Sequence, residues 1–175
     1  MYSLALAGFE KTLGPDHTST LHTVNNLGVL YAEQGRHGDA EMMYNRVLDG
    51  YEMAWGPDHT STLDTANNLG ALYAELGRQG DAEIMYNRAL AGFEKVWGPD
   101  HTSTLKALNN LGVPYADGDA EMMYKRALAG YEKAYGPDHK STLYVVDNLG
   151  NLYHKQGYND AEIMYNRVQA GNELA

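Results

Sequence analysis

The sequence contains no cysteine, so it can form neither a disulfide nor a thiolate metal site, and nothing requires an oxidising compartment. No apolar run approaches the roughly 20 residues that span a bilayer. Basic residues are scarce: 13 lysines and arginines stand against 23 acidic residues, a formal net charge of −10. This balance argues against nucleic acid and anionic membranes, which attract basic patches. We therefore expect a cytoplasmic protein that binds neither.

Catalytic and nucleotide-binding motifs are missing as well. The sequence contains no GxxxxGK[ST], no GxSxG and no HExxH. Its carboxylates and histidines recur at equivalent positions of a repeat, as structural residues do. We therefore expect a protein without enzymatic activity, without a metal site and without a cofactor.

What the chain does contain is an internal repeat. The octapeptide GPDHTSTL, which becomes GPDHKSTL in the last copy, recurs at spacings of 42, 42 and 38 residues. Self-similarity at such a period is typical of stacked supersecondary units. The four copies stand at 14–21, 56–63, 98–105 and 136–143.

Each repeat has the pattern of two helices. The Asp, His, Thr and Ser residues before the first helix offer N-cap oxygens, and Gly35 is placed to end it. The second helix is followed by Gly56 and Pro57, which stop it because proline cannot continue a helix. The first helix carries an apolar face at i, i+3, i+4 and i+7. Its members in the first repeat are Val24, Leu27, Gly28 and Tyr31.

This spacing resembles the signature of the tetratricopeptide repeat (TPR), L-G-x2-Y followed by A-x3-[FY]-x2-A. The 42-residue length, with GPDH between repeats and NNL in the first helix, resembles the kinesin light chain subtype. The wording GPDHTSTLxTxNNLGxLYAEQG is closer still to the repeat tails of fungal NACHT or NB-ARC ATPases. The resemblance covers essentially the whole chain, and it implies an all-α, right-handed solenoid of antiparallel helix pairs with about nine helices. The matching residues are Leu27, Gly28, Tyr31, Ala40, Tyr44 and Val47.

The repeat boundaries divide the chain into five segments. The first aligns with a second helix alone, which predicts a cut through a longer array. The last helix carries polar Gln169 and Asn172 at stripe positions, which is typical of a terminal helix. The segments are 1–13, a lone second helix, followed by repeats 14–55, 56–97, 98–135 and 136–175.

The third repeat has lost four residues and carries Pro114 where the second repeat has Leu72. A proline inside a helix removes a hydrogen bond and clashes with the preceding turn. We therefore predict a short, bent first helix and a change in the curvature of the array. The deletion could serve as a hinge or altered pocket, or it could be tolerated without a function.

An NNLG motif recurs in the first helices, as DNLG in the last, although Asn costs about 0.6 kcal/mol relative to Ala inside a helix. A helical wheel places the pair opposite the apolar face. The resemblance implies that first helices line a concave, peptide-binding groove. The predicted groove residues are His22, Asn25, Asn26, Val29, Asp64, Asn67, Asn68, Ala71, Lys106, Asn109, Asn110, Val113, Tyr144, Asp147, Asn148 and Asn151.

The charges on this face predict a neutral or basic protein or peptide ligand, because acidic side chains outnumber Lys106 and Lys155. The acidic members are Glu33, Asp64, Glu75, Asp117 and Asp147. Tyr144 is a candidate aromatic anchor. The asparagines could instead bond to a neighbouring helix and set the stacking register.

A different function is also open. Residues 1–13 leave an apolar face uncovered, which a second copy could cover to form a homodimer. The recurring histidines are expected to cap helices, since repeats stack about 10 Å apart and two histidines so spaced cannot share a zinc ion. They are His17, His59, His101 and His139.

Overall fold

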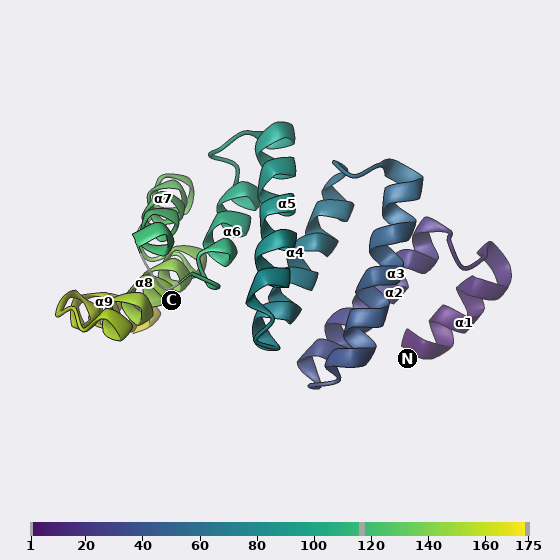
Figure 1. Cartoon of the computed structure of the whole chain (residues 1–175), viewed down its shortest axis with the longest axis horizontal. Helices are drawn as coiled ribbons and strands as arrows, with labels where there is room; N and C mark the ends of the chain where they lie inside the picture. The colour runs from purple at the N-terminus through teal and green to yellow at the C-terminus, as the bar shows by residue number, and fades with distance from the viewer. Residues whose placement is uncertain (1, 116–117, 174–175) are drawn as a thin grey trace. The chain divides into compact units, whose positions relative to one another are not determined.

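The computed structural model describes residues 2–115 and 118–173, and these residues form nine α-helices and no strand (Figure 1). The all-α, nine-helix prediction is therefore confirmed for the described residues. None of the described helices combines the length and the hydropathy that crossing a bilayer requires. The helices are α1 (Tyr2–Leu13), α2 (Thr18–Glu33), α3 (His37–Trp55), α4 (Thr60–Glu75), α5 (Gln79–Trp97), α6 (Thr102–Leu111), α7 (Gly118–Tyr135), α8 (Lys140–Gln156) and α9 (Asp160–Glu173).

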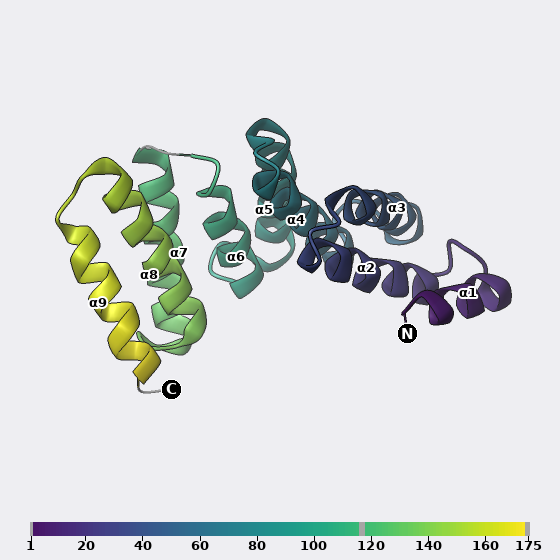
Figure 2. The ribbon, with the colours of Figure 1, turned by 90° about the horizontal axis from the view of Figure 1, so that it is seen from below.

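The chain forms two compact units. Unit 1 is Met1–Val96, with α1 to α5, and unit 2 is Trp97–Ala175, with α6 to α9. In unit 1, α2 packs against α1 and α3, and α4 packs against α2 and α3. In unit 2, α8 lies between α7 and α9, as Figure 2 shows. In the solenoid reading, α2, α4, α6 and α8 are the first helices of the four repeats.

The lone helix α1 is tied to the first repeat by apolar and charged contacts. Leu6 packs against a buried cluster that includes Val24 and Tyr51. On the surface, Arg46 on α3 forms an ion pair with Glu10 at 2.8 Å. These contacts anchor α1 on the first repeat, and its assignment as the lone second helix of a truncated unit stays a prediction.

A histidine is the N-cap residue of every first helix. The Nδ1 atom of His17 accepts a hydrogen bond from the backbone N–H of Ser19 at 3.2 Å, and the other three repeats have the same bond at the same distance. The capping role predicted for the histidines is confirmed, but the expected capping atom was an oxygen and the observed one is a ring nitrogen. Aromatic residues that end the preceding helices stack on these rings, as Trp55 does on His59 and Trp97 on His101.

A buried threonine fixes the loop that precedes each first helix. Thr62, which is fully buried, donates its hydroxyl hydrogen to the Gly56 carbonyl at 3.0 Å. Gly56 has a φ of 91°, a backbone conformation that glycine adopts readily and that residues with a β-carbon rarely adopt. The same bond joins Thr20 to Gly14, Thr104 to Gly98 and Thr142 to Gly136.

In the third repeat, α6 has 10 residues where α4 has 16. Helix α6 ends at Leu111, and the Gly112 N–H closes it on the Leu108 carbonyl at 3.2 Å. The predicted shortening is confirmed, but the predicted bend is wrong, because the helix ends before Pro114 instead of bending at it. The physical reason is that proline disfavours a helical conformation for the residue before it. The predicted change in curvature stays a prediction, and Asp117 lies outside the described residues.

Candidate functional site

The predicted groove residues lie in three different environments. His22, Asn26, Asp64, Lys106, Val113, Tyr144 and Asn151 are exposed. A second group is half-buried and consists of Asn25, Val29, Asn68, Ala71, Asn110, Asp147 and Asn148. The third group is buried and consists of Asn67 and Asn109. All but Val113, which follows the end of α6, are carried by first helices.

The buried asparagines correct the helical-wheel placement. Asn67 is 3% exposed and Asn109 is 2% exposed, whereas the wheel put both on a free face. In unit 2, Asn148 on α8 donates from Nδ2 to Oδ1 of Asn109 on α6 at 3.1 Å. The first asparagine of the third repeat therefore holds two successive first helices together. This is the structural alternative that the sequence left open.

A hollow of about 230 Å³ lies on the first-helix face of unit 1. Val29, Ala32 and Glu33 of α2 form one side, and residues of α4 form the other. Tyr44 of α3, which is 3% exposed, closes it from within. The α4 side is Asn68, Ala71, Leu72 and Glu75. We call these eight residues the unit 1 hollow.

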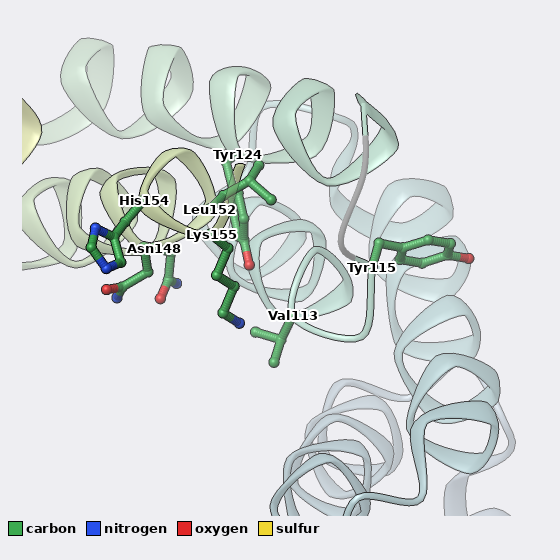
Figure 3. A pocket seen from close by; sticks show the side chains of 8 residues that line it. Val113, Tyr115, Tyr124, Asn148, Leu152, His154 and Lys155 are labelled. Carbon is green, nitrogen blue, oxygen red and sulfur yellow. The ribbon is translucent and has the colours of Figure 1, made fainter. Parts of the chain in front are cut away.

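A second hollow, of about 260 Å³, lies in unit 2 (Figure 3). Figure 3 shows Lys155 extending toward Val113, whereas Tyr115 and His154 point away to opposite sides. The hollow opens where α6 has ended early and the chain runs on through Val113 and Tyr115. The unit 2 hollow comprises Val113, Tyr115, Tyr124, Asn148, Asn151, Leu152, His154 and Lys155.

The two hollows share six repeat positions. Four positions carry the same residue type in both: Val29 and Val113, Tyr44 and Tyr124, Asn68 and Asn148, and Leu72 and Leu152. Two positions differ in polarity or charge. Ala71 is replaced by Asn151, and Glu75 is replaced by Lys155. Six of the eight positions of each hollow are therefore equivalent, and one of the six differs in charge. The repeat equivalents of Ala32 and Glu33 lie outside the described residues.

A smaller hollow of about 140 Å³ in unit 1 brings together predicted residues from α2 and α4: His22, Asn25 and Asp64. Within the described residues, the buried Oδ1 atom of Asn25 has no hydrogen-bond partner. The other predicted residues line none of these hollows; they are Asn26, Asn67, Lys106, Asn109, Asn110, Tyr144 and Asp147. Their assignment to a peptide groove stays a prediction.

Tyr44 matches a position of the repeat signature and Tyr124 stands at the equivalent position, but the sequence did not show that both residues face the hollows. Burial raises the pKa of Tyr44 to about 12, with a further contribution from the carboxylates of Glu75 and Glu33. Burial also raises the pKa of Tyr124 to about 12, with a contribution from Tyr144. A sequence signal for this position is the glycine in the first helix of each repeat, Gly28 or Gly112. Each glycine leaves room for the ring of Tyr44 or Tyr124 against the helix backbone.

Comparisons with known proteins agree with this architecture. A model of the tetratricopeptide repeat family matches residues 1–53, 54–95 and 115–173, which leaves out the segment that contains α6. No curated protein matches the chain.

Solved structures share the fold. The crystal structure of BtubC (BKLC) from P. vanneervenii has a TM-score of 0.81 at 24% identity, over 99% of this chain and 71% of that one. A Podosopora anserina protein described as a kinesin light chain, with nearly identical TPR-like repeats, has a TM-score of 0.78 at 22% identity, over 97% and 82%. MamA has a TM-score of 0.58 at 20% identity, over 99% and 90%.

Proposed function

Because the chain belongs to the tetratricopeptide repeat family, whose fold is typical of protein–protein interaction scaffolds, we propose that it is a scaffold without enzymatic activity. In this proposal it binds an extended peptide, or one helix of a partner protein, against its first helices. The observation that carries the proposal is that predicted groove residues line a hollow in each unit. Asn68 in the unit 1 hollow offers an amide group that can donate and accept hydrogen bonds together. Asn151 in the unit 2 hollow already donates to Asp147 at 3.2 Å and accepts from the Tyr165 hydroxyl at 3.0 Å, and its amide keeps one N–H and one oxygen lone pair for a ligand.

We infer that the ligand is neutral or basic. The unit 1 hollow contains Glu33 and Glu75 and no lysine or arginine among its residues. Asp64 adds a third carboxylate in the neighbouring small hollow. With a net charge of −10 on the chain, an acidic ligand would approach against a repulsive field.

A peptide array tests the proposal. Labelled full-length protein is applied to an array of decapeptides of varied sequence, and the binders are measured again in solution. The double variant Asn68→Ala, Asn151→Ala removes one amide from each hollow and is expected to weaken binding about tenfold or more, since each lost hydrogen bond is worth about 1 kcal/mol.

The control is the double variant Asn87→Ala, Asn166→Ala, which removes two exposed amides from the second helices α5 and α9. It is expected to bind like the unchanged protein. An array without any binder, or an equal loss in both double variants, would rule out binding at the first-helix face.

An observation on α1 favours a second candidate function, self-association. Leu4 is 83% exposed, Phe9 38% and Leu13 45%, so the helix presents apolar side chains without cover. A second copy of the chain could bury them and form a dimer, and the chain would then be an assembly module of a larger protein. The double variant Leu4→Glu, Phe9→Glu should then convert dimers to monomers in a light-scattering measurement. A monomer before the change would exclude this function.

The resemblance to the repeat tails of fungal NACHT or NB-ARC ATPases stays a prediction, as does the cytoplasmic location.

A further inference from the structure

We propose, on the premise of the proposed function, that the unit 1 hollow takes up the charged end of one lysine or arginine side chain of the bound peptide. In the same proposal, Lys155 keeps that side chain out of the unit 2 hollow. The two hollows then differ in the side chain that each accepts, although they share six repeat positions.

The unit 1 hollow has the chemistry of a cation site with apolar walls. Glu33 on α2 and Glu75 on α4 contribute carboxylates from its two sides, and both residues are exposed. Within the described residues, the basic group closest to either carboxylate is His37, whose Nδ1 lies 3.9 Å from Glu75. Val29 and Leu72 offer apolar surface. The methylene stem of a lysine or arginine can pack on such a surface while its charged end stays in a polar environment.

Tyr44 supplies an independent observation that points to a ligand. Its side chain is 3% exposed and lines the hollow, yet no hydrogen bond of its hydroxyl is found within the described residues. The pKa of this hydroxyl is raised by burial and by the carboxylates of Glu75 and Glu33, so the hydroxyl lies within their field. An ammonium or guanidinium N–H can donate to the hydroxyl oxygen while it pairs with a carboxylate.

The hollow is large enough for such a group. Its volume of about 230 Å³ is several times the roughly 30 Å³ that a water molecule occupies in the liquid. It opens to solvent on the face where Glu33 and Glu75 are exposed, so a side chain can enter without a movement of the helices.

The unit 2 hollow is a copy with the opposite charge at the decisive position. Lys155 stands where Glu75 stands in unit 1, and within the described residues it forms no ion pair. Its side chain extends toward Val113, and both residues line the hollow (Figure 3). A ligand cation would meet a like charge there, which is unfavourable at short distance.

The test uses the full chain and the tightest arginine-containing peptide from the array, together with a copy in which citrulline, a neutral isostere, replaces that arginine. Binding is followed by the backbone amide signals of Ala71 for unit 1 and Asn151 for unit 2. The arginine peptide is expected to shift the Ala71 signal and to bind roughly tenfold or more tighter than the citrulline copy, as loss of a charge-assisted hydrogen bond predicts.

Two variants locate the effect. The double variant Glu33→Gln, Glu75→Gln should remove the preference for arginine over citrulline while the citrulline peptide binds as before. The variant Lys155→Glu should add a second arginine-dependent shift, at Asn151. Both changes affect exposed side chains, so the thermal midpoint is expected to stay close to that of the unchanged protein.

The matched control separates a site from general attraction to an acidic chain. Asp16→Asn with Asp49→Asn removes two exposed charges from unit 1 outside its first-helix face and should leave the preference for arginine intact. An equal loss of preference in this control, or equal binding of the arginine and citrulline peptides, would overturn the inference and leave the proposed function standing. An array without binders would instead end the proposed function.

Discussion

Leu63 on α4 lies directly on the backbone of Gly92 on α5: a β-carbon added to Gly92 would be 2.3 Å from Cδ2 of Leu63. The same contact recurs in the other repeats, between Leu21 and Gly50, Leu105 and Gly130, and Leu143 and Gly171. The two helices of each repeat therefore approach as closely as a glycine allows. This close approach seats the first helices, which carry the predicted groove residues.

We predict that Gly92→Ala destabilises the protein by about 1–3 kcal/mol, because the new methyl group overpacks a core in which Leu63 is 1% exposed. Urea denaturation followed by circular dichroism gives the change. The matched control is Gly80→Ala in the same helix, where nothing lies within 4 Å of the added β-carbon. That change should stabilise the helix by about 0.5–1 kcal/mol. Equal effects of the two substitutions would show that the contact with Leu63 is unimportant.

The amide pair between α6 and α8 gives a second prediction. Asn109→Ala should lower the free energy of unfolding by about 1–3 kcal/mol, because it leaves the half-buried Asn148 amide without its 3.1 Å acceptor. The exposed Asn26→Ala should change the stability by less than about 0.5 kcal/mol. Thermal denaturation of both variants distinguishes a stacking role of the first asparagine from a role in ligand binding alone.

The histidine caps give a third prediction. His101→Ala removes the acceptor for the Ser103 N–H and the ring that stacks on Trp97, so we expect a loss of about 0.5–2 kcal/mol. His101→Asn keeps a capping acceptor and should recover most of this loss. A variant with Asn that is as unstable as the Ala variant would assign the loss to stacking and not to capping. Urea denaturation of both variants, followed by circular dichroism, measures the loss.

The buried tyrosines predict a limit of stability at alkaline pH. Burial raises the pKa of Tyr44, Tyr51, Tyr124 and Tyr131 from 10.0 to about 12. The raised pKa means that the folded state holds the phenol proton more tightly than the unfolded state does. The stability that these protonated phenols contribute is complete below pH 10 and is lost as the pH rises through about 12.

Urea denaturation at several pH values from 9 to 12 measures this loss. Tyr44→Phe cannot ionise and should lose less stability over this range, while Tyr158→Phe, at a residue that is 57% exposed, should follow the unchanged protein. Identical pH profiles for all three proteins would contradict the assignment to buried phenols.

The helices could be predicted from sequence because each has strong local signals. The helical spacing of Val24, Leu27 and Gly28 predicts a buried face. Gly56 and Pro57 predict the end of the helix that precedes them. The resemblance supplied how the helices stack. The end of α6 was missed because a proline can bend a helix or end it, and only the contacts beyond Leu111 decide between the two.

The candidate site was predicted only in part. A wheel drawn for α4 alone identifies the face toward its own partner helix, but a first helix in a stack also has first helices as neighbours. Asn67 is therefore buried on a side that the wheel left free. Aligning the repeats shows that Glu75 and Lys155 occupy equivalent positions. Only the structure shows that each of them lines a hollow.

The loop from Gly56 to His59 has the same length in all four copies, whereas the third copy has lost residues between the two helices of the repeat. The loop is held by its own backbone and side chains, through the bond from Thr62 to Gly56 and the cap at His59. We expect it to be the natural junction for gene duplication and for engineering: repeats joined there should yield arrays of any chosen number of hollows.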